Sequence, residues 1–306
     1  MRILKIIDQY GWAYFFIDRE QQRYSVHEII IARPEQAILA GVDILFIHSP
    51  DISDFARGNL PLIAHKNGIK VIGCYSGQVD FRYSYADLIV TISPQTYAIA
   101  KEFGYECPVV FIPEGVDTKF FLPGQFNKDR FKVGWAGRPC AVKRPHLLDR
   151  LSFPVHKKAE WGHEYFKEDR VLDSMLEFYH SIDCLVLTSI QECMPRVVME
   201  AMACGLPVVS TDVGSIRMLL DPEMIIPNIT DEAELIARFN AILQDLHSGQ
   251  LNREQIGLDN RLRLEYFSAE VLACFWDFVF KSLSAGRITN NEIKIIAHTC
   301  GVPCLE

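Results

Sequence analysis

The sequence lacks the features that would place the protein in or across a membrane. No apolar run reaches the roughly 20 residues of a membrane-spanning helix. The opening "MRILKIID" reads as a buried strand and is too short for a secretory signal. The chain also lacks positive charge, since its formal net charge is −8. That balance argues against general binding to nucleic acid or anionic membranes, while leaving room for a local basic groove.

Disulfide and metal patterns are missing as well. The nine cysteines are an odd number, no CxxC pair occurs, and most lie in apolar stretches, as Cys184 does in "DCLVLTS". We therefore expect reduced, buried thiols in a cytoplasmic protein, with Cys300 and Cys304 as the exposed pair. His298 alone does not complete a metal site with that pair, so no metal site is expected. We leave Leu305 and Glu306 out of the argument, since a cloning scar can end in the same way.

What the chain has is length and apolar content. Its 306 residues are 49% apolar, enough for a large core and about two domains. Short apolar runs alternate with amphipathic stretches, which is typical of a parallel sheet covered on both faces. The first series has expected strands at 2–7, 28–32, 43–48, 70–75, 87–92 and 109–112, with helices at 12–24, 58–67 and 94–104.

The same alternation then starts again after a stretch rich in Pro, Gly and Asn, "FFLPGQFNKD" (120–129). We place a domain boundary there, between 1–124 and 125–267. The pattern predicts an α/β protein with two doubly wound Rossmann-like domains facing a central cleft, where ligands bind beyond the carboxyl ends of the strands. The second series has expected strands at 131–136, 183–189, 207–212 and 224–227, with helices at 145–151, 170–180, 195–203, 231–246 and 268–284.

Two glutamates stand out in the mostly apolar segment "QECMPRVVMEAMACG" (191–205). Glu192 lies in the loop after a strand, and Glu200 lies on the expected helix, four residues after Arg196. An Arg at a helix start opposes the helix dipole unless an anion docks there, and free N–H groups at a helix start bind phosphate. The two acids would then flank a phosphate and accept hydroxyl groups on either side. The alternative is a surface Arg196–Glu200 pair beside a solvated acid.

A second cluster follows the first strand of the second series, in "VGWAGRPCAVKR". Gly134 and Gly137 permit tight backbone geometry, while Arg138 and Lys143 place two cations at the carboxyl end of a strand. Such cations bind phosphate groups. The alternative is two solvated cations in a polar loop. The spacing of a nucleotide-binding P-loop is absent.

These segments resemble the family 4 glycosyltransferases, retaining enzymes of the GT-B fold. "ECMPRVVMEAMACGLPVVSTDVGS" is similar to their E-x7-E segment, "VGWAGRPCAVK" to their phosphate-binding loop, and "IPEGVDTKFFLP" (112–123) to their interdomain linker. The motifs cover roughly residues 108 to 220. The resemblance also implies that the last helix, 268–284, packs back on the first domain. The role of the tail 286–306 stays open.

The resemblance assigns roles by position. It makes Arg138, Lys143, Glu192 and His48 the catalytic set, with the two cations on the donor diphosphate and Glu192 on the transferred sugar. His48 ends a strand where the family places a histidine facing that sugar; the alternative is a core histidine. The other implied donor contacts are Gly11, Gly137, the backbone of Met194, Pro195, Arg196 and Val197, and Glu200 on the ribose.

Some positions depart from the family pattern. Cys193 and Met194 stand where Gly and Phe are usual, Glu114 replaces an Asn, and Arg144 replaces a Gly. The first loop has one glycine followed by Trp12 instead of a glycine pair, so the acceptor side is less well defined. We take Tyr10 and Trp12 as weak candidates for acceptor contacts, since aromatic residues are more often core.

The predicted function is transfer of a sugar from a nucleotide-diphosphate sugar to a glycan or other hydroxyl acceptor, in glycan or polysaccharide biosynthesis. The resemblance implies no metal and no cofactor, a UDP- or GDP-sugar donor, and a cytoplasmic enzyme, with association at the inner membrane face left open. Two alternatives remain. One is a sugar transferase acting on modified bases of phage-type DNA, which the acidic charge disfavours. The other is a nucleotide-sugar-binding module without turnover.

Overall fold

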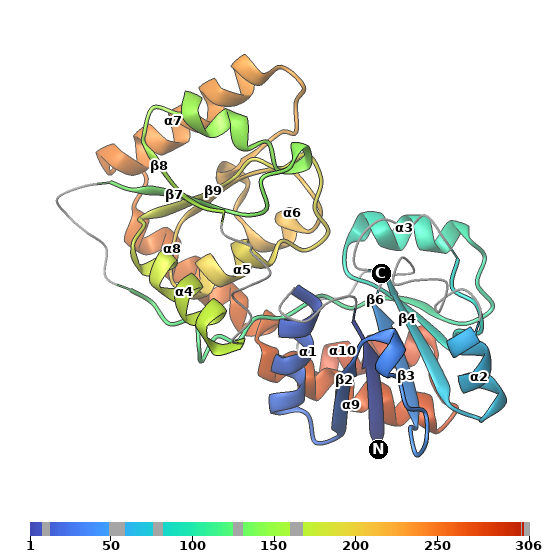
Figure 1. Ribbon diagram of the computed structural model, residues 1–306. Helices are drawn as coiled ribbons and strands as arrows, with labels where there is room; N and C mark the ends of the chain where they lie inside the picture. The colour runs from blue at the N-terminus through green and yellow to red at the C-terminus, as the bar shows by residue number, and fades with distance from the viewer. Residues whose placement is uncertain are drawn as a thin grey trace. The chain divides into compact units, whose positions relative to one another are not determined.

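The computed structural model comprises two compact α/β units. The first unit consists of Met1–Gly115 and Tyr266–Glu306, and the second unit of Val116–Glu265. Figure 1 shows the strands and helices of each. The structure describes residues 1–7, 13–48, 59–75, 82–124, 131–159, 168–300 and 302.

The first unit is built on a six-stranded parallel sheet with the order β2-β1-β3-β4-β5-β6. Its strands are almost wholly apolar because both faces are covered. They match the six strands expected from the sequence to within a residue or two at each end. Their bounds are β1 Arg2–Ile6, β2 Glu28–Ala32, β3 Ile44–His48, β4 Lys70–Tyr75, β5 Leu88–Thr91 and β6 Val109–Phe111.

In the first unit, helix α3 begins with a proline and a capping serine, both of which favour a helix start. Helix α3 starts at Pro94, and the Ser93 hydroxyl accepts from the Thr96 N–H at 3.1 Å, so the end of the helix is capped. The helices of this unit are α1 Ala13–Tyr24, η1 Pro34–Gln36, α2 Leu60–Lys66, α3 Pro94–Glu102, α9 Ala269–Ser284 and α10 Asn290–Cys300.

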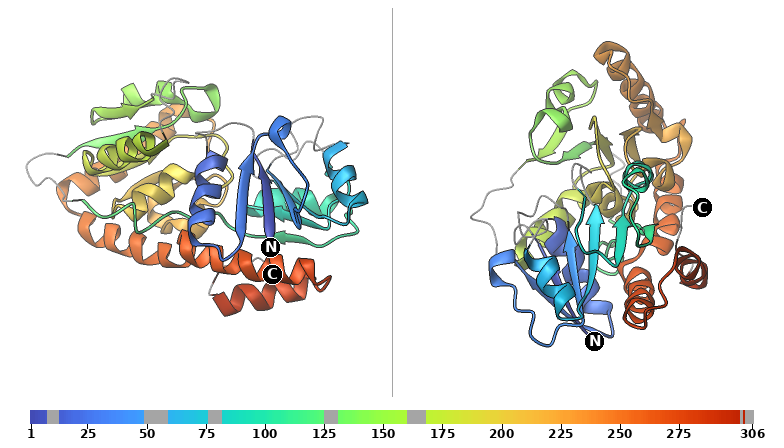
Figure 2. Two further views of the ribbon diagram at one scale, coloured as in Figure 1. Left: turned by 60° about the horizontal axis from the view of Figure 1, so that its bottom comes forward. Right: turned by 90° about the vertical axis from the view of Figure 1, so that its right-hand side faces the viewer.

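The last two helices pack on the first unit, and Figure 2 shows them side by side. Asp277 of α9 accepts the backbone N–H of Val26 at 2.9 Å and the hydroxyl of Ser25, which ties α9 to the end of α1. In the tail, whose conformation the sequence left open, α10 buries Ile293 and Ile296. The end of the chain thus adds a further helix to the first unit.

The second unit has a five-stranded parallel sheet with the order β11-β10-β9-β7-β8. The sequence does not predict β8, because its four residues, "VHKK", are mostly polar and lie partly exposed at the sheet edge. Such a strand carries no apolar run. The strands are β7 Val133–Ala136, β8 Val155–Lys158, β9 Cys184–Leu187, β10 Val208–Thr211 and β11 Ile225–Ile226.

The helices of the second unit include one that the sequence analysis missed, α8. It has few apolar residues, and it is anchored by Asn260, whose amide donates to the Leu206 carbonyl at 2.8 Å. The expected helix at 145–151 is a 3₁₀ helix. The helices are η3 Ala141–Lys143, η4 Pro145–Arg150, α4 Glu168–His180, α5 Arg196–Ala203, α6 Ile216–Leu219, η5 Pro222–Met224, α7 Glu232–Ser248, α8 Arg253–Arg263 and η6 Leu264–Phe267.

The first unit ends at Gly115, whereas the loop-forming composition placed the boundary after residue 124. The intervening segment is held by the second unit. Arg261 donates to the carbonyl oxygens of Thr118 and Phe121, each at 3.0 Å, and the Phe121 side chain is fully buried. The buried Phe121 side chain and the bonds from Arg261 thus assign residues 116–124 to the second unit. The turn-forming residues that follow do not mark this boundary.

The cysteines in the described part of the chain are all free, and Cys74, Cys184 and Cys204 are buried. Cys300 is only partly exposed and forms a side-chain hydrogen bond with Cys274; burial raises its thiol pKa to about 11. Its expected partner Cys304 lies outside the described residues.

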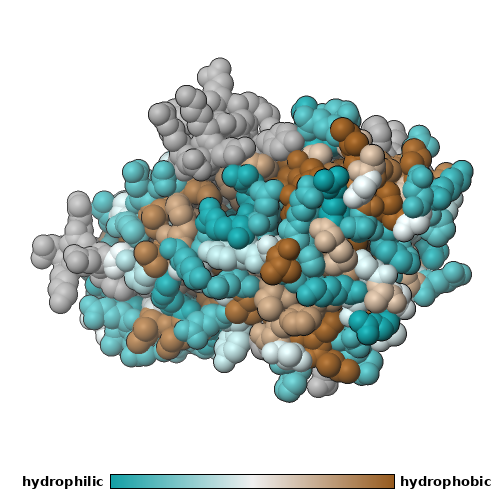
Figure 3. Space-filling view, turned by 90° about the horizontal axis from the view of Figure 1, so that it is seen from below, coloured by the Kyte–Doolittle hydropathy of each residue, from teal (hydrophilic) through white to brown (hydrophobic). Residues whose placement is uncertain are grey.

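The described helices include none that is long and apolar enough to cross a membrane. Figure 3 shows one face of the molecule, on which hydrophilic and hydrophobic residues are interspersed. Large apolar side chains that are exposed, such as Val26 and Ile38, are normal on a protein surface when they occur singly.

Candidate functional site

The loop after β7, residues 137–144, is shaped to stabilise negative charge. The Cys140 N–H donates to the Arg138 carbonyl at 2.8 Å, and the Lys143 N–H points back to Cys140. Burial raises the pKa of the Cys140 thiol, but the backbone N–H groups of Val142 and Lys143 and the side chain of Arg138 outweigh it, so the pKa is lowered. The groups that favour a thiolate here are those that a phosphate would need.

This loop meets the loop after β9 at two predicted residues. Lys143 Nζ forms an ion pair with Glu192 Oε1, and the same oxygen accepts the Ser189 hydroxyl at 2.6 Å. The Lys143 and Glu192 side chains are 27% and 11% exposed, so the pair is partly open to solvent. The structure thus brings together a cation and a carboxylate that stand 49 positions apart in the sequence.

The other predicted acid, Glu200, lies on α5 and is almost fully buried. Arg196 Nε donates to Glu200 Oε1 at 2.7 Å, and the Tyr179 hydroxyl donates to Oε2 at 2.8 Å. Burial raises the pKa of Glu200, and the neighbouring Arg196 and Tyr179 only partly oppose it. Arg196, whose role the sequence left open, pairs with Glu200. Tyr179 was not expected, because its position on α4 reads as core.

Helix α5 starts at Arg196, with Pro195 as its N-cap, one residue later than expected. The Val198 and Met199 N–H groups point to the Pro195 carbonyl, so the N–H groups before them face out of the helix start. The Met194 side chain is buried. Pro195 makes no side-chain cap at this helix start, and the start of a helix favours an anion.

Gly214 fixes the backbone beside Glu192. A Cβ atom at this glycine would overlap the carbonyl oxygen of Cys193, and φ is +54°, in the left-handed region. The Ser215 N–H donates to the same carbonyl at 2.8 Å. The loop after β10 therefore supports the Glu192–Cys193 peptide by direct contact. Gly214 lies within the segment that resembles the E-x7-E motif, but the sequence does not indicate its role.

Arg144, which stands where the related family has glycine, adopts the left-handed conformation with φ 47° and ψ 51°. This conformation costs a residue with a side chain about 1–2 kcal/mol. The residue is 6% exposed, and its guanidinium donates to the carbonyls of Thr188 at 2.5 Å and Ser189 at 3.0 Å. Burial lowers the pKa of Arg144, and Glu232 opposes this. Sequence reasoning noted the unusual residue but not this contact set.

In the first unit, His48 lies at the end of β3 and is buried. Its Nε2 lies 2.9 and 3.0 Å from the two oxygens of Asp18, and Lys5 Nζ lies 2.5 Å from the same carboxylate. Tyr14 stacks on the imidazole at 4.8 Å between ring centroids. Burial tends to raise the pKa of Asp18, but the attraction of His48 and Lys5 outweighs it and lowers the pKa.

An ionised Asp18 fixes the His48 tautomer. Nε2 then carries the proton, and Nδ1 of a neutral ring is left as an acceptor. Lys5 and Asp18 were not found from the sequence. The one feature of the sequence that points to this cluster is Lys5 in the apolar strand "RILKII", because a buried lysine needs a charged partner.

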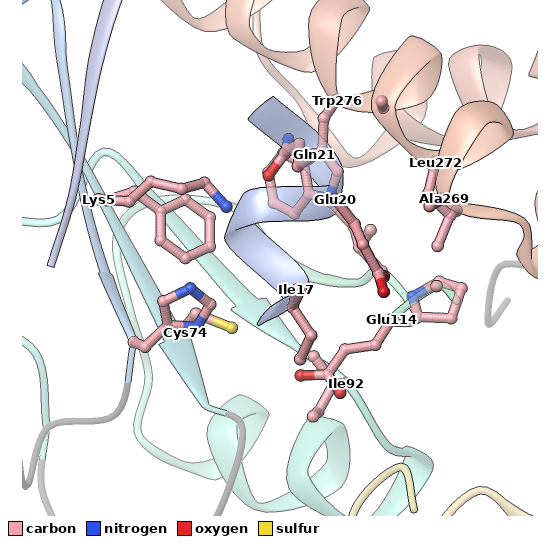
Figure 4. A pocket seen from close by; sticks show the side chains of 16 residues that line it. Lys5, Ile17, Glu20, Gln21, Cys74, Ile92, Glu114, Ala269, Leu272 and Trp276 are labelled. Atoms are coloured by element: carbon pink, nitrogen blue, oxygen red, sulfur yellow. The ribbon is translucent and has the colours of Figure 1, made fainter. Parts of the chain in front are cut away.

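A pocket of about 40 Å³ in the first unit adjoins this cluster, large enough for ordered water. Figure 4 shows Lys5 on one side of it and Glu114 and Leu272 on the other. His48 and Gln21 are among the residues that line it, and within the described part of the chain His48 Nδ1 and Gln21 Nε2 are buried without a hydrogen-bond partner. The pocket therefore offers one acceptor and one donor to a polar molecule.

Three predicted residues, Tyr10, Gly11 and Trp12, lie outside the described residues. Gly137 is described, and its N–H donates to the Lys158 carbonyl at 3.2 Å, which joins the loop 137–144 to the edge strand β8. The described residues include no group of three or more His, Cys, Asp or Glu side chains placed to hold a metal ion.

Parts of the sequence are similar to known glycosyltransferases. Residues 151–245, within the second unit, match the family described as "Glycosyl transferases group 1". A curated relative, D-inositol 3-phosphate glycosyltransferase of Paenarthrobacter aurescens (strain TC1), is 22% identical over 211 residues, which are 56% of this chain and 51% of the relative. The chain thus matches about half the length of that relative.

Solved structures resemble nearly the whole chain. Sucrose-phosphate synthase from Thermosynechococcus elongatus has a TM-score of 0.69 at 15% identity, covering 94% of this chain and all of that one. HepE from Anabaena in complex with UDP-glucose has a TM-score of 0.66 at 14% identity, covering 94% of this chain and all of that one. These likenesses show the two-domain GT-B fold, and the comparisons together support a glycosyltransferase family for the chain.

Proposed function

We propose that this chain is a retaining, family 4 type glycosyltransferase that moves a sugar from a nucleotide-diphosphate sugar to an acceptor hydroxyl in glycan or polysaccharide biosynthesis. The observation that carries the proposal is the meeting of Lys143 with Glu192 beside the start of α5. A cation, a carboxylate and a helix start within one partly open site suit a ligand that carries phosphates and hydroxyl groups.

In this proposal the Lys143–Glu192 ion pair is the contact that a bound donor replaces. A diphosphate placed between the loop 137–144 and the helix start takes over the positive charge of Lys143. Glu192 is then released to accept hydroxyl groups of the transferred sugar, while Ser189 keeps its carboxylate in place. The exchange costs less than breaking a fully buried pair, because the Lys143 side chain is 27% exposed and can reach solvent.

Charge development on the leaving diphosphate is stabilised by protein groups that are already in place. Arg138 and the backbone N–H groups of Val142 and Lys143 lower the pKa of the Cys140 thiol, so this loop favours a negative charge. In this proposal the Lys143 side chain and the start of α5 act on the same charge. Preorganised donors of this kind accelerate a reaction by electrostatic stabilisation. We therefore propose that the reaction needs no metal ion.

Glu200 binds the ribose diol in this proposal. Its two oxygens already accept from Arg196 and Tyr179. A carboxylate offers about four lone-pair sites, so each oxygen keeps room for one more donor. The existing bonds hold the carboxylate in one orientation before the ribose arrives.

In the first unit we propose His48 as the residue that contacts the donor sugar through Nδ1, with Gly11 near the donor phosphates and Tyr10 and Trp12 near the acceptor. The support for His48 is its fixed tautomer and its place on the wall of the pocket. UDP-sugars are the first donors to test, since one structurally similar protein, HepE, was solved with UDP and with UDP-glucose.

The proposal is tested with a melting-temperature screen against UDP-, GDP-, ADP- and dTDP-sugars, followed by mass spectrometry of donor turnover. We expect one nucleotide class to raise the melting temperature and the sugar to be released or transferred. Binding without any turnover would instead support a nucleotide-sugar-binding module. Stabilisation by no nucleotide sugar would contradict the proposal, and salt-dependent DNA binding would point to a DNA acceptor.

A further inference from the structure

Arg144 has a backbone that its residue type disfavours. It is one of only two non-glycine residues in the described part of the chain with positive φ, the other being Tyr85 at 59°. Such a conformation persists when surrounding contacts impose it, and it is often found where a functional site is shaped. Arg144 directly follows Lys143, so its conformation also sets where the Lys143 side chain leaves the chain.

The Arg144 side chain binds the loop that carries Glu192. Nε donates to the Thr188 carbonyl at 2.5 Å, and Nη2 donates to the Ser189 carbonyl and to Asn228 Oδ1, each at 3.0 Å. The Asn228 amide in turn donates to the Ile190 carbonyl at 2.7 Å. The guanidinium and the amide thus bind three consecutive carbonyls after β9. Arg144 can bind two of them at once because its donors form a planar fork, which lysine lacks.

The two loops are also joined in the opposite direction. The Thr188 hydroxyl donates to the Lys143 carbonyl at 2.7 Å, and the Ile190 N–H donates to the Val142 carbonyl at 2.8 Å. Ser189, whose carbonyl Arg144 holds, bonds through its hydroxyl to Glu192. A continuous set of contacts therefore runs from Lys143 through Arg144 to Glu192.

We propose that Arg144 is a positioning residue of the donor site. Together with Asn228 it fixes the loops of Lys143 and Glu192 at one separation before the nucleotide sugar binds. This inference rests on the proposed function, and it adds a residue that touches neither donor nor acceptor. In the related family a glycine at this position permits the same backbone conformation, so this chain adds a side-chain brace to it.

Arg144→Gly separates positioning from folding, because glycine adopts the left-handed conformation without strain while the guanidinium is lost. We expect a lower melting temperature, because the lost guanidinium bonds to buried carbonyls outweigh the relieved backbone strain. We also expect a donor KM raised about tenfold or more and a kcat per folded molecule that falls, since small misplacements in a site cost up to about 10²-fold. Arg144→Lys should rescue little. A purely structural role would lower the melting temperature in the same way but leave the donor KM of the folded protein unchanged.

Tyr85→Gly is the matched control, since it relieves the same backbone conformation in the first unit. Its donor KM should equal that of the wild type. If Arg144→Gly does not fold, Asn228→Ala removes the other half of the brace without altering the left-handed residue and should raise the donor KM in the same direction. Wild-type donor parameters in Arg144→Gly, or in Asn228→Ala where the former is unfolded, would overturn the inference.

Hydrogen exchange gives a readout that needs no donor. In Arg144→Gly the amide protons of residues 188–192 should exchange faster while those of β9 and β10 keep their protection. Unchanged protection at 188–192 would contradict the positioning role of Arg144, even if the enzyme is active. Failure of the wild type to bind any nucleotide sugar would sink the proposed function instead, and the exchange result would still decide the brace.

Discussion

Two groups of charged side chains, one in each unit, differ in their exposure to solvent. In the first unit the Lys5 and Asp18 side chains are 2% and 0% exposed and bind one another together with His48. In the second unit the Lys143 and Glu192 side chains are 27% and 11% exposed. The buried cluster of Lys5, Asp18 and His48 resists separation, because a charge that lost its partner would stay buried without water to solvate it. A partly open pair can exchange one partner for a ligand.

This contrast predicts where mutation affects stability and where it affects activity. Removing a group from the buried cluster should destabilise the fold. Removing a group from the open pair should leave the fold almost intact and reduce donor binding and transfer.

The largest effect on stability is expected for Asp18→Asn. The substitution keeps the shape but leaves Lys5 charged and without a carboxylate, and breaking a buried pair costs about 3–5 kcal/mol. The free energy of unfolding is measured by urea titration. Glu28→Gln, which breaks the exposed Arg2–Glu28 pair of the same sheet, should cost no more than about 1 kcal/mol. Equal stability of the two variants would remove the contrast between buried and open pairs.

Lys143→Ala should reduce transfer about 10²–10³-fold, the usual cost of removing one group that stabilises developing charge. Its melting temperature should change little, because the pair with Glu192 is partly exposed. Initial rates with a saturating acceptor measure the effect. Lys157→Ala, at an exposed ion pair with Asp149 in the same unit, serves as the control and should keep full activity. A large loss of stability in Lys143→Ala would show that the pair is structural.

Gly214→Ala should cost about 1–3 kcal/mol of stability from strain and also weaken donor binding, because the new Cβ displaces the Cys193 carbonyl next to Glu192. Gly249→Ala is the matched control: φ is +81°, but no atom lies within 4 Å of the added Cβ. It should show the backbone strain alone. Wild-type donor affinity in Gly214→Ala would mean that the Glu192 loop does not depend on this contact.

The smallest effect is expected from pH. Because the folded pKa of Asp18 is lowered from 3.8, its contribution to stability is present above about pH 4 and is lost as the pH falls through the folded pKa. Acid unfolding followed by circular dichroism should show a steeper loss below pH 4 for the wild type than for Asp18→Asn. Parallel curves would mean that Asp18 binds its proton equally well in the folded and unfolded protein.

Apolar patterning predicted the fold well where elements are buried on both sides. All six strands of the first sheet were expected, because each is an apolar run. Strand β8 and helix α8 were missed, since one is a polar edge strand and the other is held by the buried Asn260 instead of an apolar stripe. Periodicity reports burial of apolar residues and is silent on elements held by hydrogen bonds.

The candidate site was predictable where a motif marks it and unpredictable where distant residues meet. The sequence indicated Lys143, Glu192 and Glu200 through their segments. It did not indicate Asp18 or Tyr179, whose partners are 30 and 21 positions away and become neighbours only in the fold. The brace formed by Arg144 is of the same kind, since it spans 44 positions to Thr188.

The central claim is that the Lys143–Glu192 pair marks the donor diphosphate site, and calorimetric titration with the UDP-sugar that most stabilises the wild type tests it most directly. Wild type and Lys157→Ala should bind it with equal affinity, and Lys143→Ala should bind at least about tenfold more weakly, the equivalent of about 1.4 kcal/mol. Equal affinity of all three proteins for the donor would contradict the account.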